Sequence, residues 1–186
     1  MRWDELFADL EAQLVAAEDA ELAGEVADRT RGEVGGTALV DRARTAVGGP
    51  LRVQVVGHEP VAGLLLEVGS EWLLLRDAQG RDVLVPWAAV LALVGLGAAT
   101  ADRDEMGPTF RRLGLSFALR ALARDRAAVA VALLDGSVVT GTVDRVGRDF
   151  FDLSEHPHGE ARRAREVAAV RVIRQEAVAL VTAQLG

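Results

Sequence analysis

The sequence contains no cysteine, lysine, asparagine or tyrosine, and its one isoleucine is Ile173. The absence of cysteine excludes disulfides, cysteine-ligated zinc, iron–sulfur clusters and thiol nucleophiles. Because all 21 basic residues are arginines, the chain also has no lysine for a Schiff base or a phosphate-binding loop. Lysine, asparagine, tyrosine and isoleucine have AT-rich codons, so this composition reflects a GC-rich genome and does not point to a function.

The negative charge is concentrated at one end of the chain. Residues 1–36 contain ten acidic residues and three arginines, which accounts for the whole net charge of −7. Residues 37–110 are mildly acidic, and residues 111–186 are mildly basic. An acidic protein is a poor general binder of nucleic acid, and only the C-terminal half leaves room for a local exception.

The sequence predicts a cytoplasmic protein that does not bind membranes. Its acidic start, MRWDELFADLE, lacks the basic region and apolar core of a secretory signal. Val83–Ala101 is 19 residues long without a charge, which is enough to span a bilayer. We interpret it instead as a buried strand, a turn at Pro86–Trp87 and a second strand, because its repeat counterpart carries several charges.

An internal repeat is the strongest feature of the sequence. Residues 61–75 match residues 139–153 at an offset of 78, as shown by the pairs Val61/Val139, Gly63/Gly141, Val68/Val146, Gly69/Gly147 and Leu75/Leu153. Two extra residues then restore a match between Ala88–Val90 and Ala168–Val170. We infer a duplicated unit of about 55–60 residues.

Each unit is predicted to hold a short helix followed by five short strands. Thr37 and Ser116 are the expected helix N-caps. In the second unit the expected strands are 129–134, 137–146, 149–154, 162–167 and 169–174, with a tight turn at Asp135–Gly136. Trp72 and Phe150 occupy the same repeat position, and we expect both to be buried core residues.

This pattern, from Asp135–Gly136 through Gly141 and Phe150 to Leu153, resembles the Sm-like fold, with SH3-like small barrels as the alternative. The resemblance implies an α+β, mainly β protein with two tandem Sm-like five-stranded small barrels, each preceded by a short helix. The expected organisation is an acidic helical arm over 1–36, a first unit over 37–96, a flexible linker over 97–112 and a second unit over 113–186. The opening RWDELFADLEAQL resembles an uncharacterised actinobacterial family.

The arm is predicted to be one long amphipathic helix over residues 3–31. Trp3, Phe7, Leu10 and Leu14 recur at helical spacing. This stripe either packs on the chain's own barrels or binds another protein chain.

The residues that carry chemistry in other proteins are sparse here. His156 and His158 lie two residues apart beside Glu155 and Glu160 and form a weak candidate metal site, for which a polar hairpin loop is the alternative. No serine has a nucleophile-elbow context, and no cofactor motif or small-molecule substrate site is evident. We therefore expect a protein that is not an enzyme and has no cofactor.

Two functions remain for a protein of this kind. The first is a protein-interaction or assembly module, since exposed strand edges and the arm are the available binding features. The fifth strand of one unit is expected to pair with the fourth strand of the other, within one chain or between chains. The alternative is an RNA-binding regulator that uses the arginine-rich surface of the second unit, formed by Arg145, Arg148, Arg162, Arg163 and Arg165. The simpler interpretation of these arginines is a solvated surface of ion pairs.

Overall fold

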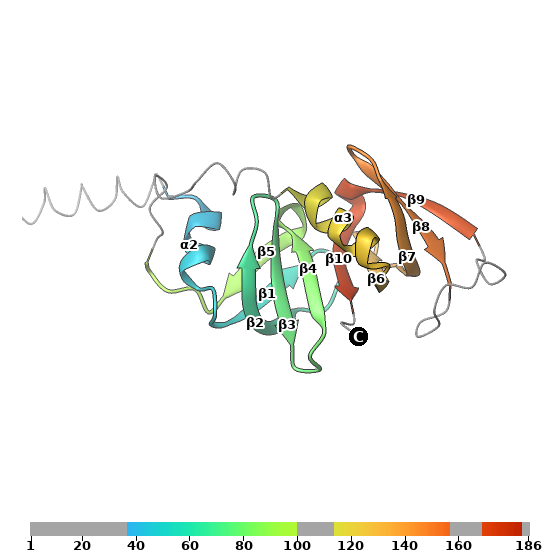
Figure 1. Ribbon diagram of the computed structural model, residues 1–186. Coiled ribbons are helices and arrows are strands. Elements are labelled where there is room, and N and C mark those ends of the chain that lie inside the picture. Colours follow the sequence, from blue (N-terminus) through green and yellow to red (C-terminus); the bar gives the residue numbers. More distant parts are fainter. Residues whose placement is uncertain (1–36, 100–113, 157–168, 184–186) are drawn as a thin grey trace, which may run out of the picture. The chain divides into compact units, whose positions relative to one another are not determined.

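The computed structural model describes residues 37–99, 114–156 and 169–183. The first repeat consists of α2 (Leu39–Thr45), β1 (Pro50–Val55), β2 (Val61–Val68), β3 (Trp72–Asp77), β4 (Asp82–Pro86), the 3-10 turn η1 (Trp87–Ala89) and β5 (Val90–Val94). The second consists of α3 (Leu115–Asp125), β6 (Ala128–Leu133), β7 (Val138–Val146), β8 (Phe150–Glu155), β9 (Ala169–Arg174), η3 (Gln175–Ala177) and β10 (Val178–Ala183) (Figure 1). The predicted helix over residues 3–31 and most of the predicted linker lie outside the described residues.

The ten strands form one open antiparallel sheet in the order β5-β1-β2-β3-β4-β10-β6-β7-β8-β9. The prediction of two five-stranded barrels is therefore wrong, although the mainly β composition is confirmed. In each repeat the fifth strand pairs with the first and does not close onto the fourth. β4 pairs with β10 of the other repeat instead, which joins the two halves into one sheet and leaves β5 and β9 at its ends.

The two repeats match closely over their first three strands. Gly63 lies opposite Asp77 in the β2–β3 pair, and Gly141 lies opposite Glu155 in the β7–β8 pair, at the same offset of 78. A Cβ atom at either glycine would come within about 2.3 Å of a carbonyl oxygen on the neighbouring strand, so only glycine fits there. Both pairs also have a bulge two residues later. The predicted 78-residue register is confirmed for these strands.

The fifth strand predicted for the second repeat is misassigned. Residues 169–174 do form a strand, β9, but it corresponds to β4 of the first repeat, and β5 corresponds to β10, for which no strand was predicted. The predicted strand over 162–167 lies outside the described residues. η1 and η3 occupy the same place in the two repeats, so the offset rises from 78 to 88 across the segment between β8 and β9. The second copy is thus longer by ten residues and not by two.

The helices differ from the sequence prediction at their N-termini. α3 begins after Gly114 as its N-cap, and Ser116 lies inside the first turn, where its hydroxyl is 3.0 Å from Gln175 Oε1. The proposed cap at Ser116 is therefore wrong. α2 begins at Leu39, two residues beyond the proposed cap Thr37, and it ends before Gly48, whose positive φ of 85° favours glycine.

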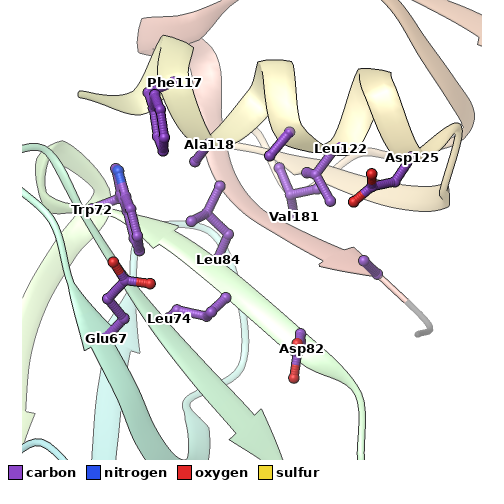
Figure 2. Close-up of a pocket in the computed structure, with 12 residues that line it drawn as sticks. Glu67, Trp72, Leu74, Asp82, Leu84, Phe117, Ala118, Leu122, Asp125 and Val181 are labelled. Atoms are coloured by element: carbon purple, nitrogen blue, oxygen red, sulfur yellow. The ribbon is translucent and has the colours of Figure 1, made fainter. Parts of the chain in front are cut away.

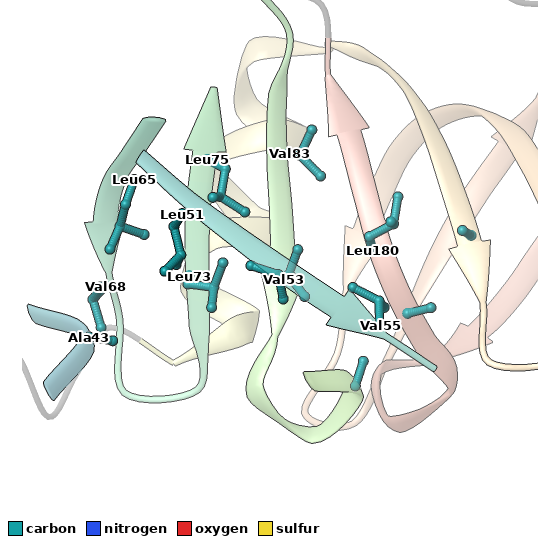
Figure 3. Close-up of a cluster of buried hydrophobic side chains, with 14 residues drawn as sticks. Ala43, Leu51, Val53, Val55, Leu65, Val68, Leu73, Leu75, Val83 and Leu180 are labelled. Carbon is teal, nitrogen blue, oxygen red and sulfur yellow. The ribbon is translucent and has the colours of Figure 1, made fainter. Parts of the chain in front are cut away.

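The hydrophobic core consists of two clusters that exchange residues between the repeats. Alternation along β1 buries Leu51, Val53 and Val55 in the first cluster (Figure 3). Leu180 of β10 also packs in this first cluster, whereas Trp72 of β3 packs in the second. The junction between the repeats is therefore part of the core, and the described residues from Leu39 onward form one compact unit.

Candidate functional site

The junction between the repeats is built on two neighbouring strands. β4 and β10 lie side by side (Figure 1), with Leu84 opposite Val181 and Val83 opposite Thr182. A fourth strand of one repeat thus pairs with a fifth strand of the other within one chain, but the segment predicted as that fifth strand, 169–174, is β9 and pairs with β8. This pairing satisfies backbone groups along one edge of each repeat.

Two side chains of the first repeat hold the start of α3 across this junction. The Glu71 carboxylate accepts a hydrogen bond of 2.8 Å from the backbone amide of Leu115. The indole nitrogen of Trp72 donates to the carbonyl of Gly114 at 3.2 Å. A carboxylate stabilises the first turn of a helix by satisfying a free amide and by opposing the positive end of the helix dipole. The N-terminus of α3 is thus capped by the other repeat.

The corresponding positions of the second repeat are uncovered. Asp149 corresponds to Glu71 and is exposed. Phe150 corresponds to Trp72, yet it is 37% exposed where Trp72 is 4% exposed. The expected burial is therefore confirmed for Trp72 and wrong for Phe150. Val172 corresponds to Leu84 by the later offset and is 65% exposed against 5%.

Local structure does not cause this difference, because each aromatic ring packs on the equivalent glycine of its own repeat. A Cβ atom at Gly69 would come within 2.5 Å of the Trp72 ring, and one at Gly147 would come within 2.5 Å of the Phe150 ring. The amides of Gly69 and Gly147 each donate to the carbonyl of the aromatic residue at 2.8 Å. What differs is the cover: α3 and β10 pack beside Trp72, and the described residues provide no corresponding helix and strand beside Phe150.

The two end strands of the sheet expose apolar side chains. Leu91 and Val94 on β5 and Val170 and Val172 on β9 are each more than half exposed. Among the described residues, each of these strands pairs with one neighbour only. Unpaired backbone groups beside exposed apolar side chains are the usual features of a strand that pairs with another chain.

The arginines proposed to bind RNA are mostly paired or lie outside the described residues. Arg145 donates to Asp152 at 2.7 Å, and Arg148 is exposed. Arg162, Arg163 and Arg165 fall in the segment that the structure does not describe. Two further arginines of this surface form ion pairs: Arg171 with Glu155 and Arg174 with Glu176. The hydrogen bond and charge of Glu155 raise the pKa of Arg171.

The candidate metal ligands are only partly described. His156 is buried, and its Nε2 atom lies 2.8 Å from the Thr142 hydroxyl. His158 lies outside the described residues. Within the described ranges, no group of three or more histidine or acidic side chains is arranged to hold a metal ion. Trp3, Phe7, Leu10 and Leu14 of the arm also lie outside them.

Sequence reasoning identified the strand edges as binding features but misplaced one of them. It assigned β9 as the fifth strand and expected it to pair with the fourth strand of the other unit, whereas β9, with its exposed Val170 and Val172, is an end strand of the sheet. The signal was present in the sequence: Ala89–Val90 matches Ala177–Val178 as well as it matches Ala169–Val170.

Comparison with protein-family models gave no match, and comparison with curated proteins gave none either. The resemblance to Sm-like proteins stays a prediction. The described part of the chain has no helix that is long and apolar enough to cross a membrane.

Proposed function

We propose that this protein is a cytoplasmic, non-enzymatic assembly module whose copies join head to tail, β9 of one copy pairing with β5 of the next. One observation carries the proposal: the β4–β10 junction forms once within the chain, while its counterparts at β9 and β5 are exposed. Each repeat has a strand equivalent to β4 and a strand equivalent to β10. Because β4 and β10 pair within the chain, their equivalents β9 and β5 remain as the two strands of a second junction between copies.

The internal junction specifies the register of the proposed contact. Because Leu84 lies opposite Val181, the 88-residue offset places Val172 opposite Leu93 of the next copy. The same offset places Arg171 opposite Val94. In this arrangement α2 of the next copy takes the position that α3 occupies over Trp72, and it covers Phe150.

Two physical arguments favour this use of the edges. Pairing would bury four apolar side chains that are more than half exposed. Each Å² of apolar surface removed from water stabilises the contact by roughly 25 cal/mol. It would also satisfy the free backbone groups of both end strands. Since the two contacting surfaces differ, the interface is heterologous, and copies add until a ring closes or a filament forms.

The arginine-rich surface offers less support for RNA binding. Of the five proposed arginines, the two within the described residues are Arg145, which is paired with Asp152, and Arg148, which is exposed.

The experiment blocks each edge separately and then combines the blocked variants. Val172→Lys places a charge on β9, and Val94→Arg places a second cation opposite Arg171. Light scattering coupled to size-exclusion chromatography should show assemblies for the native chain and monomers for either variant. An equimolar mixture of the two variants should form a heterodimer, because each still has one intact edge. Val138→Lys, at an exposed apolar position away from both end strands, is the matched control and should assemble normally.

Three outcomes would contradict the proposal. A native chain that remains monomeric at all concentrations tested would show that the edges do not pair. Blocked variants that still assemble, or a mixture that does not recombine, would show that another surface joins the copies.

A further inference from the structure

A mainly apolar cavity of about 290 Å³ lies between α3 and the sheet (Figure 2). The sheet side is formed by β3, β4 and β10, and the opposite side is one face of α3. The apolar side chains that line it include Leu74, Leu84, Val181, Ala118, Ala121 and Leu122. The cavity lies over the internal junction, so it is separate from the free edges proposed to join copies.

Three carboxylates surround this cavity, and among the described residues that line it none is cationic. Asp82 is neutralised by Arg76, whose Nε atom is 2.8 Å away. Glu67 on β2 and Asp125 in the last turn of α3 are exposed and lie at opposite ends of the cavity (Figure 2), and neither has a hydrogen-bond or ion-pair partner among the described residues. The C-terminal end of α3 adds a partial negative charge close to Asp125.

We infer that this cavity binds a small hydrophobic amine, with its apolar body between α3 and the sheet and its ammonium group beside Glu67, at the end of the cavity where Trp72 lies. The apolar lining favours an apolar body, and the unpaired Glu67 carboxylate favours a cation at that end. Trp72 also lines the cavity, and an aromatic ring attracts a cation close to its face. The volume suits one ring with a short chain, since pockets for drug-sized ligands begin at about 300 Å³.

The acidic arm is a poor occupant of the same cavity. Residues 1–36 carry the net charge of −7, and their carboxylates would be brought close to Glu67 and Asp125. Like charges brought close together oppose binding. The charge of the cavity therefore selects a cationic ligand over the chain's own apolar arm.

The first test compares three ligands of nearly equal shape and different charge. Amide chemical shifts of the full-length protein are followed during titration with 3-phenylpropylamine, 3-phenylpropan-1-ol and 3-phenylpropanoate. We expect saturable shifts over α3 and β10, with the amine binding about tenfold or more tightly than the alcohol and the acid binding most weakly. Raising the salt concentration should reduce the advantage of the amine, since exposed charges are screened.

The second test removes the charges without changing the shape of the cavity. Glu67→Gln should weaken amine binding several-fold, Asp125→Asn at the opposite end of the cavity should weaken it less, and both should leave binding of the alcohol unchanged. Glu59→Gln removes an exposed carboxylate that does not line the cavity, and it should change neither affinity. Ala121→Leu should fill the cavity and abolish binding of both ligands. Unchanged circular dichroism spectra will show that each variant is folded.

Several results would overturn the inference. These are equal affinity for the amine and the alcohol, amine binding that is insensitive to both charge-removing variants, or no saturable shift at roughly millimolar concentrations. Much tighter binding of a capped Phe-Arg dipeptide would assign the cavity to a basic peptide instead. Because assembly is measured by mass and ligand binding by shifts at α3, failure of one proposal is distinguishable from failure of the other.

Discussion

Replacing the two repeat-equivalent aromatic residues should have very different effects on stability. Trp72 is 4% exposed, and its indole donates a hydrogen bond to Gly114. Truncating a buried tryptophan to alanine costs about 3–5 kcal/mol of unfolding free energy, and a lost hydrogen bond costs about 0.5–1.5 kcal/mol. Phe150 is 37% exposed, so roughly 1–2 kcal/mol of its burial energy is lost, and solvent fills the space without leaving a cavity. We therefore expect Trp72→Ala to cost at least twice as much as Phe150→Ala.

The assay is urea denaturation followed by circular dichroism, which does not depend on tryptophan fluorescence. It should be run at protein concentrations where the native chain is monomeric, because assembly would bury Phe150 as well. Equal slopes of unfolding free energy against urea for the two variants would show that both unfold from the same state. Equal losses of stability would refute the reasoning, since they would mean that the internal junction adds nothing to the burial of Trp72.

Two further predictions concern single carboxylates. Glu71→Ala should lower the free energy of unfolding by about 1 kcal/mol, because it removes the cap on the Leu115 amide, whereas Asp149→Ala at the equivalent position should have almost no effect; urea denaturation of both variants checks this. Burial alone would raise the pKa of Asp77, but hydrogen bonds and the charge of Arg81 outweigh it and lower that pKa. The ionised Asp77 therefore stabilises the fold above its unfolded pKa of about 4. The loss of unfolding free energy caused by Asp77→Asn should shrink as the pH falls through the folded-state pKa. An equal loss at pH 7 and pH 2 would contradict this.

The sequence predicted those parts of the fold that local chemistry determines. Gly63 and Gly141 mark a close approach of neighbouring strands, and no other residue type fits there, so the repeat was readable at those points. The Asp135–Gly136 turn was readable for a similar reason, because Gly136 has a positive φ of 85°. At such positions the local backbone geometry alone determines the residue type, so the sequence predicts it without knowledge of the tertiary contacts.

The rest depends on which strands become neighbours. Phe150 and Trp72 have the same local sequence position, but only Trp72 lies under a second repeat, so periodicity could not distinguish their burial. The sequence-based alignment of the second repeat was displaced beyond β8, because the same Ala-Val pair occurs at Ala169–Val170 and at Ala177–Val178. An open sheet and a barrel also bury the same residues along each strand, so alternation alone did not separate the two.

Intermolecular crosslinking tests the assembly claim most directly, because the chain has no cysteine of its own. A variant with Leu93→Cys and Val172→Cys places one thiol on each end strand, at positions that the proposed register sets opposite each other. Directly opposite residues of an antiparallel pair lie within the range that a disulfide spans. Under mild oxidation we predict a ladder of disulfide-linked multimers on a non-reducing gel. The control with Leu93→Cys and Arg171→Cys, whose second thiol is one residue out of register, should give little product. Monomers alone, or an equal ladder from the control, would contradict head-to-tail pairing of β9 with β5.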